Sequence, residues 1–391
     1  MKNKWLMALA GMTLQLSIGS VYAYSVWIKP IQALTQWDAG QLKLAFSFAI
    51  CTLGLTAAFM GRFVQKIGPV KAGCISALYF GLGLAGTGYA IAIQSLPLFY
   101  LFYGLISGIG LGFGYITPVS VVVKWFPQKP GFASGLVIMS FAAGSILASQ
   151  IISPMVQSLG VSGAFYTLAA VYSSMMVLAS LYLALPKVAA VVSTNTNSKN
   201  ASAPALVKDV RFYGLWLMLF FNTTAGIALI AVAAPMAKDV INISEKAAIA
   251  FVGTIGLFNG LGRLAWSSIS DKIGRWKTFT SFFLIGAFCF LLLTQTTNVL
   301  AFEVLVFLII SCYGGAFATM PAFIKDIYGA DHLGAVFGYV LTAWAAAAFA
   351  GPLLIGITTD YAFVFYLFAG FLGFTALLSF LLKKKLTPVA A

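Results

Sequence analysis

The chain has 391 residues, of which 61% are hydrophobic and only 8% are charged. This composition excludes a soluble globular domain and predicts an all-α membrane protein, in which about 20 apolar residues form one span. The net charge of +14 does not indicate nucleic-acid binding, because the basic residues are spread along the chain at the ends of apolar runs, where they set membrane topology.

The N-terminal segment has two interpretations. Lys2, Lys4 and the apolar run that ends in Val21-Tyr22-Ala23 are similar to a signal peptide with a small-residue cleavage site. We reject that interpretation, because the apolar run continues through Trp27 and serves as the first span of the repeat described below. We therefore expect this segment to remain in the protein as a membrane helix.

Apolar runs predict twelve transmembrane helices in two halves. The first six are predicted at 5–28, 42–62, 72–93, 97–123, 131–153 and 163–185. The second six are predicted at 211–234, 247–268, 278–297, 300–321, 334–357 and 362–382. The polar segment between them predicts an N-terminal six-helix bundle at 1–185, a flexible linker at 186–210 and a C-terminal six-helix bundle at 211–391.

The distribution of basic residues predicts the orientation. Of the 23 lysine and arginine residues, 18 fall on the side of the N-terminus, 4 fall on the opposite side, and Arg263 lies within a span. Positive charge concentrates on cytoplasmic loops, so both termini and the linker are predicted to be cytoplasmic. We expect a multi-pass protein of the inner (plasma) membrane of a prokaryote that works as a monomer in the lipid bilayer.

The two halves repeat short patterns. Three pairs share an offset of 203 or 206 residues: Gly131-x-x-x-Gly135 with Gly334-x-x-x-Gly338, Pro118 with Pro321, and Lys66-Ile67-Gly68 with Lys272-Ile273-Gly274. Such spacing indicates duplicated, pseudo-symmetric halves. Membrane proteins built from two six-span halves place their substrate site near the membrane midplane, between the halves.

Arg263 is the candidate binding residue. An arginine near the bilayer centre costs at least about 2.5–3.5 kcal/mol, so it marks a functional site by default; the alternative is a packing or snorkelling arginine. Asn259 lies four residues earlier and shares its helix face. The guanidinium fork matches a carboxylate, and the asparagine is suited either to a substrate hydroxyl or carbonyl or to an interhelical hydrogen bond. Cysteines at 51, 74, 289 and 312 lie in apolar runs, and His332 is the single histidine, so we expect no metal, cofactor or catalytic residue.

Two loop segments resemble the signature of the major facilitator superfamily. The first is Gly61-Arg62-Phe63-Val64-Gln65-Lys66-Ile67-Gly68, with Gln65 in place of the usual acid, and the second is Ser267 to Arg275, with Ser267 in place of glycine. The resemblance implies gating roles, which hold one state closed, for these residues: Gly61, Gly68, Asp271, Gly274 and Arg275. Within the superfamily the chain resembles the oxalate/formate antiporter and monocarboxylate transporter group. Three stretches carry this resemblance: Gly19–Trp27, Lys124–Gly135 and Asn259–Arg263.

This resemblance implies a carboxylate held by Arg263 and lined by aromatic residues of the first, fourth, tenth and eleventh spans. The matching positions are Tyr22, Tyr24, Tyr115, Tyr313, Phe317 and Trp344. We interpret Trp27 as an anchor at the outer membrane surface. Oxalate carriers have a lysine where this chain has Trp344, and the animal proton-coupled carriers have an aspartate where it has Asn259.

The predicted function is transport of small organic anions by alternating access, with monocarboxylates such as lactate, pyruvate or formate as substrates. The alternatives are an oxalate-type dicarboxylate exchanger and an efflux carrier for larger organic acids or drugs. None of the nine acidic residues lies near a span centre, whereas a proton-driven symporter usually carries a titratable acid at depth. We therefore expect exchange or uniport, and the cost of a bare Arg263 in an empty occluded cavity favours antiport.

Overall fold

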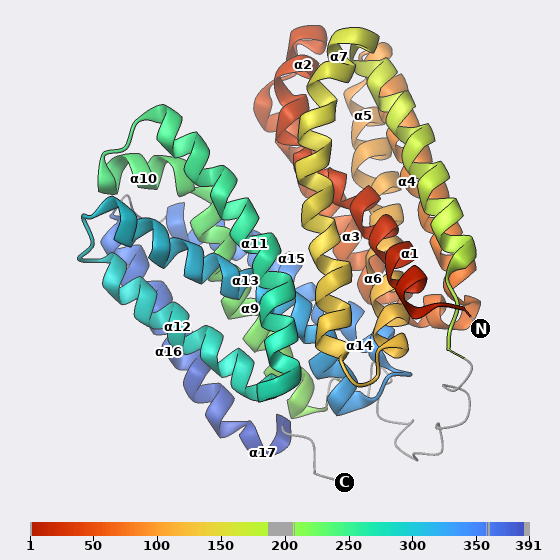
Figure 1. Ribbon diagram of the computed structural model, residues 1–391. Coiled ribbons are helices and arrows are strands. Elements are labelled where there is room, and N and C mark those ends of the chain that lie inside the picture. The colour runs from red at the N-terminus through yellow and green to blue at the C-terminus, as the bar shows by residue number, and fades with distance from the viewer. Residues whose placement is uncertain (1, 187–205, 207, 357, 359, 387–391) are drawn as a thin grey trace. The chain divides into compact units, whose positions relative to one another are not determined.

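The computed structural model describes residues 2–186, 206, 208–356, 358 and 360–386, and every regular element within these ranges is a helix (Figure 1). The first half contains α1 (Lys4–Gly19), η1 (Ser20–Ala23), α2 (Ser25–Thr35), α3 (Ala39–Ile67), α4 (Pro69–Ala92), α5 (Leu96–Phe99), η2 (Tyr100–Ile106), α6 (Ser107–Trp125) and α7 (Pro130–Tyr182). Much of the predicted linker at 186–210 lies outside the described residues.

The second half of the chain is also helical. This half contains α9 (Val210–Ala231), α10 (Ala233–Ile241), α11 (Glu245–Ile273), α12 (Arg275–Leu293), α13 (Val299–Tyr328), α14 (Leu333–Val340), α15 (Thr342–Gly356), α16 (Tyr361–Leu381) and α17 (Lys383–Leu386). Across the described ranges, eleven helical segments are long and apolar enough to cross a membrane. The chain is therefore a multi-pass, all-helical membrane protein.

The longest helix contains two of the predicted spans. α7 runs over 53 residues and is interrupted at Gly160, whose φ of 70° and ψ of 171° are not helical. The chain reverses direction near this residue (Figure 1), and glycine tolerates the positive φ because it has no Cβ. The predicted spans at 131–153 and 163–185 both start in α7. Twelve crossings and cytoplasmic termini remain predictions.

Two predicted spans contain breaks in the α-helical backbone. In the first, α1 gives way to the 3₁₀ turn η1 at Ser20, and α2 follows as far as Thr35, beyond the predicted end at residue 28, while the segment long and apolar enough to cross a membrane is Lys4–Ala23. The difference arises because Lys29 and Pro30 lower the local hydropathy, although α2 continues through them. In the fourth span, η2 has π-helical geometry over Tyr100–Ile106. Single turns of π-helix occur frequently at functional sites.

The structure divides into two compact units. Unit 1 comprises residues 1–127, 136–195 and 330–339, and unit 2 comprises residues 128–135, 196–329 and 340–391. Each unit therefore includes the start of one helix from the other half of the sequence: the beginning of α7 belongs to unit 2, and α14 belongs to unit 1.

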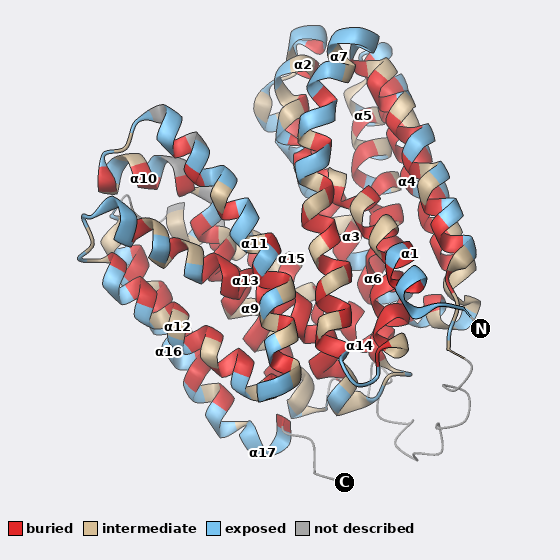
Figure 2. Ribbon diagram, viewed as in Figure 1, coloured by how far each residue is buried: buried red, intermediate tan, exposed pale blue. Residues whose placement is uncertain are grey.

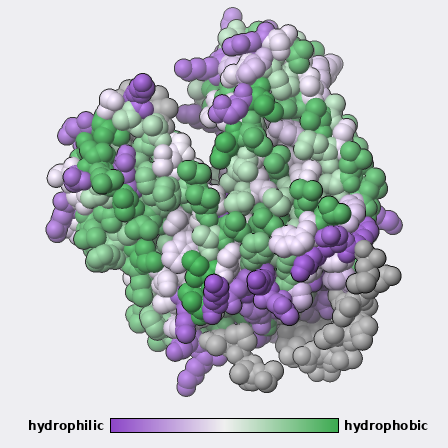
Figure 3. Space-filling view, viewed as in Figure 1, coloured by the Kyte–Doolittle hydropathy of each residue, from purple (hydrophilic) through white to green (hydrophobic). Residues whose placement is uncertain are grey.

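Burial follows the pattern expected for helices in a membrane. In each unit the buried residues lie between helices, and exposed residues lie on outward faces (Figure 2). Many of the exposed side chains are large and apolar, including Phe59, Leu178 and Leu381. Hydrophobic side chains cover much of the visible surface, and hydrophilic ones gather toward helix ends (Figure 3). Because lipid tails are themselves apolar, such faces need no protein partner in a bilayer.

Candidate functional site

Close packing of α11 on α13 determines the surroundings of Arg263. A Cβ at Gly262 would collide with the backbone of Ser311, and one at Gly314 would collide with the backbone of Asn259. Glycine at both contacts removes these collisions, so the two helices approach more closely than larger side chains would permit. This approach brings the face of α11 that carries Arg263 next to the aromatic residues of α13.

Arg263 is 3% exposed and has a polar and an aromatic neighbour. Its Nε donates to Asn259 Oδ1 across 3.4 Å, one helical turn away. The Cζ atom lies 5.9 Å from the centre of the Phe317 ring, within the range of a cation–π interaction. These contacts orient the guanidinium from two sides, and the spacing of four residues that predicted the Arg263–Asn259 pair is confirmed.

The predicted aromatic residues of the second half surround Phe317. Its ring centre lies 5.4 Å from that of Tyr313 and 5.3 Å from that of Trp344, and both pairs are T-shaped. Edge-to-face geometry is the arrangement that aromatic quadrupoles favour. Unit 2 thus brings together Arg263, Asn259 and the three aromatic residues, which we call the arginine cluster.

The predicted tyrosines of the first half separate into two environments. Tyr22 and Tyr115 both contact Phe141, with ring centres 5.0 and 5.6 Å away. The ring centre of Tyr24 instead lies 4.8 Å from that of Tyr103, with the two rings tilted, and its hydroxyl donates to the carbonyl of Leu42 at 2.6 Å. The hydroxyl of Tyr24 is therefore engaged with the backbone of α3, which favours a packing role for this residue.

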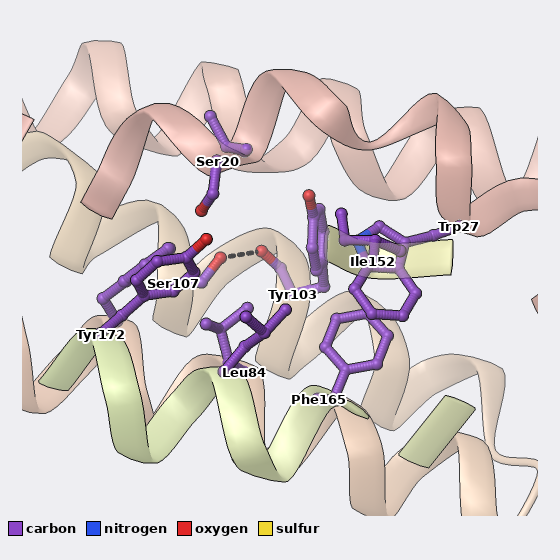
Figure 4. Close-up of a pocket in the computed structure, with 11 residues that line it drawn as sticks. Ser20, Trp27, Leu84, Tyr103, Ser107, Ile152, Phe165 and Tyr172 are labelled. Atoms are coloured by element: carbon purple, nitrogen blue, oxygen red, sulfur yellow. Dashed lines mark hydrogen bonds between the residues drawn. The ribbon is translucent and has the colours of Figure 1, made fainter. Parts of the chain in front are cut away.

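A small cavity lies beside the two irregular segments of unit 1. It has a volume of about 20 Å³, and its polar lining comes from Ser20 of η1, Tyr103 of η2, Ser107 and Tyr172 (Figure 4). This volume holds about one water molecule. The Ser107 hydroxyl donates to the Tyr103 carbonyl, which helps to satisfy a backbone group within the π-helical segment.

Trp27 is buried, so the prediction that it anchors the chain at the membrane surface is wrong. Instead of anchoring the chain at the membrane surface, it is 4% exposed, lines this cavity and stacks on Phe165 with ring centres 4.1 Å apart. The 3₁₀ turn of η1 changes the angular spacing of the residues that follow it. The prediction placed Trp27 at the outer end of a span that stops at residue 28, whereas α2 continues to Thr35 and packs Trp27 on Phe165 of α7.

Two buried amide side chains were not predicted from the sequence. Gln15 in α1 is fully buried and donates through Nε2 to the carbonyl of Tyr115 at 2.9 Å. Asn222 in α9, 207 residues later, is 5% exposed and donates to the carbonyl of Cys312 at 3.5 Å. Each links the first long helix of a half to the fourth-span helix of that half. The available signal was an amide side chain inside an apolar run.

The predicted gating residues Asp271 and Arg275 form an ion network in unit 2. The Asp271 carboxylate accepts from the backbone N–H groups of Gly131 at 2.9 Å and Phe132 at 2.8 Å, at the start of α7. Arg275 pairs with Asp271 at 2.6 Å and with Asp326 at 3.0 Å. A negative charge at a helix N-terminus satisfies free amides and complements the helix dipole. This gate network therefore holds the start of α7 against the end of α11.

The position in unit 1 that corresponds to Asp271 carries an amide, Gln65, instead of a carboxylate. Gly68 and Gly274 end α3 and α11 with φ values of 84° and 92°, so both loops turn in the same way. A Cβ at Gly61 would collide with the backbone of Gly334, so α3 and the start of α14 are in close contact. Gln65, at the position that corresponds to Asp271, lies beside Gly334. The first copy thus replaces an ionic contact with a neutral one.

Comparison with known proteins agrees with this architecture. A sequence model of the Major Facilitator Superfamily matches residues 7–352. The chain is 26% identical to the oxalate:formate antiporter of Oxalobacter formigenes over 397 residues, which cover 99% of this chain and 93% of that protein. It is also 26% identical to apicoplast pyruvate carrier 1 of Toxoplasma gondii over 376 residues, which cover 78% of this chain and 67% of the carrier.

Solved structures agree on the fold. The proton:xylose symporter of the major facilitator superfamily aligns with a TM-score of 0.76 and 13% identity, and covers 98% of this chain and 96% of its own. The family resemblance seen in the loop motifs is therefore confirmed, as is the similarity to oxalate/formate and monocarboxylate carriers. The chain belongs to the Major Facilitator Superfamily and is a membrane transporter rather than an enzyme.

Proposed function

We propose that this transporter carries small monocarboxylates, such as lactate, pyruvate or formate, by alternating access, with the substrate carboxylate bound to Arg263. The observation that carries the proposal is the guanidinium of Arg263, a residue 3% exposed, which bonds to Asn259 and faces the ring of Phe317. A bidentate pair with a carboxylate is strong where water is excluded. The names of the relatives, an oxalate:formate antiporter and a pyruvate carrier, support the same class of substrate.

The chemistry of the arginine cluster favours one carboxylate over two. The guanidinium has the amide of Asn259 and the ring of Phe317 beside it, and the rings of Tyr313 and Trp344 pack on Phe317. A second carboxylate would lie against aromatic groups and lose most of its hydration, which is costly for an ion. Asn259 and the Tyr313 hydroxyl suit the carbonyl or hydroxyl group of a 2-oxo or 2-hydroxy acid.

The proposal extends to the setting of the transporter. We place it as a monomer in the inner membrane of a prokaryotic cell, with bundles 1–185 and 211–391 joined by a cytoplasmic linker. The gate network would stabilise the conformation in which the start of α7 is docked on α11, and Gly61 and Gly68 would serve the corresponding contact of α3. In unit 1, Tyr22 and Tyr115 are the proposed substrate-facing residues, and Tyr24 supports them by packing.

Transport measurements on purified protein test the proposal. Proteoliposomes are loaded with unlabelled lactate, and uptake of radiolabelled lactate is competed with formate, pyruvate, oxalate, malonate and larger amphipathic acids. We expect competition by the monocarboxylates, and weak competition by the dicarboxylates. Strong competition by oxalate would favour a dicarboxylate exchanger, and competition by the amphipathic acids alone would favour an efflux carrier.

The mode of transport is expected to be exchange. Each of the nine acidic residues lies at or near a helix terminus or in a connection, as Asp38, Glu303 and Asp360 do, so the spans offer no central carboxyl for a proton relay. Vesicles loaded with a monocarboxylate should take up labelled lactate at least about tenfold faster than empty vesicles. Net accumulation in empty vesicles, driven by a pH gradient alone, would contradict this prediction.

Replacement of Trp344 by lysine is expected to shift specificity toward dicarboxylates. Trp344 is 4% exposed and packs on Phe317 beside Arg263, so a lysine there adds a second cation to the arginine cluster. A hydrogen bond to a charged group contributes about 1.5–3 kcal/mol, so the ratio of oxalate to lactate uptake should rise about tenfold or more.

Trp344→Met provides the matched control, because it removes the ring without adding charge. It should lower the uptake of both anions without raising the ratio. An equal ratio in the lysine and methionine variants would show that position 344 does not contact the substrate.

A further inference from the structure

We propose a second binding site for a small carboxylate in unit 1, in the cavity where Lys124 pairs with Asp331. The cavity has a volume of about 240 Å³ and lies between the end of α3, α6 and Asp331, which is two residues before α14. Drug-sized ligands occupy about 300–1,000 Å³, so this space suits a smaller anion. The inference rests on the proposed function for the identity of that anion.

A polar stripe on α6 lines the cavity. Thr117, Ser120 and Lys124 are separated by three and four residues, so they share one face of the helix, and Gln65 of α3 also lines the space. The Thr117 side chain is fully buried, and among the described residues its hydroxyl has no hydrogen-bond partner. A buried hydroxyl without a partner is costly. An oxygen-bearing ligand in the cavity would remove this cost.

The two side chains of the ion pair in the cavity differ in their exposure to solvent. The Lys124 side chain is 12% exposed, whereas that of its partner Asp331 is 57% exposed, and their charged atoms are 3.2 Å apart. A lysine with so little contact with water needs an anion beside it. An exposed carboxylate loses little when it moves into solvent. The substrate carries the same chemical group as Asp331, so it can replace that group on Lys124 at low cost.

The repeat explains why the cavity occurs in unit 1. In unit 2, Asp271 supplies the carboxylate that binds the start of α7. Gln65 occupies the corresponding position in unit 1, and the carboxylate comes from the exposed Asp331 instead. An anion bound to Lys124 could also accept from Thr117 and Gln65, because a carboxylate has about four acceptor positions. The charge distribution places this site on the side predicted to be cytoplasmic, where it would hold substrate before or after transport.

Thiol protection tests the site directly. Val121 lines the cavity and is not one of the proposed ligands, so Val121→Cys is introduced with Arg263→Gln after replacement of the four native cysteines by alanine. The reaction rate with uncharged methyl methanethiosulfonate is measured in sodium lactate and in sodium chloride of equal ionic strength. We expect lactate to slow the reaction at least about threefold, and Lys124→Gln, but not the matched exposed variant Lys129→Gln, to abolish this protection.

Asp331→Asn should strengthen lactate binding, whereas Lys124→Gln should abolish it. A variant that fails to fold could not show stronger binding. Asp331→Asn removes the competing carboxylate, so the lactate concentration that gives half protection should fall about two- to fivefold. Protection that persists in Lys124→Gln, or its absence in Asp331→Asn, would overturn the site, and so would protection by inorganic phosphate without protection by lactate. Because the Arg263→Gln background removes the proposed transport site, these results are independent of whether Arg263 binds the transported anion.

Discussion

Arg263→Gln is expected to reduce monocarboxylate exchange by about 30-fold or more, because the loss of one partner from a buried, hydrogen-bonded charge pair costs about 2–5 kcal/mol. Glutamine keeps an amide donor of similar reach but removes the positive charge and the second donor of the fork. The reduction is measured as the rate of lactate exchange in proteoliposomes and as the lactate affinity from isothermal titration. Both quantities should fall together, since the arginine acts on the bound substrate itself.

Two further substitutions separate charge from geometry. Arg263→Lys retains a cation without the planar fork, so its exchange rate should fall between those of the native protein and Arg263→Gln. Lys277→Gln removes one positive charge from an exposed position next to the gate network and should leave exchange within about twofold. Normal exchange by a folded Arg263→Gln protein would refute the proposed binding site.

The arginine cluster could be predicted from the sequence because helical spacing determines most of it. Arg263 and Asn259 are four residues apart on α11, and Tyr313 and Phe317 are four apart on α13, so each pair shares a face without any knowledge of the tertiary structure. Packing of α11 on α13 then brings the two faces together through Gly262 and Gly314. The helical period alone therefore predicts which residues share a face, because both members of each pair lie within a single helix.

The first span could not be predicted with the same accuracy. Hydropathy reports how apolar a segment is, but it does not distinguish α, 3₁₀ and π hydrogen-bond patterns. The break at η1 separates Tyr22, which contacts Phe141, from Tyr24, which bonds to Leu42. Trp27, which the sequence predicted at the membrane surface, is buried. Side-chain directions after such a break depend on tertiary packing, so a pattern that assumes a uniform helix fails there.

The gate network was predicted in part. The loop motif identified Asp271 and Arg275, and their spacing of four residues explains the ion pair between them. Asp326 lies 51 residues beyond Arg275, and nothing in the sequence near it indicates a partner. The backbone amides of Gly131 and Phe132 carry no side-chain signal at all. Contacts of this kind require the three-dimensional arrangement of three helices.

Arg275→Gln is expected to lower the free energy of unfolding by about 3–5 kcal/mol, because it leaves two carboxylates without their shared cation. The Arg275 side chain is 8% exposed, and those of Asp271 and Asp326 are 9% and 28% exposed. Asp271 would keep the two amide donors of α7, which moderate its loss, but Asp326 would face another carboxylate across the space that the guanidinium filled. Denaturant unfolding in lipid nanodiscs, followed by tryptophan fluorescence, measures the change.

Removal of the charge on Asp326 tests whether repulsion between the two carboxylates causes the loss of stability in Arg275→Gln. Addition of Asp326→Asn to Arg275→Gln removes one of the two carboxylates that lose Arg275, so the double variant should be more stable than the sum of the two single losses predicts. Lys272→Gln, an exposed basic residue one turn earlier, should change stability by less than about 0.5 kcal/mol. If the double variant instead loses the full sum, packing of the arginine side chain rather than its charge holds this part of the gate network together. A small loss in Arg275→Gln itself would show that the amides of Gly131 and Phe132 alone suffice to hold Asp271.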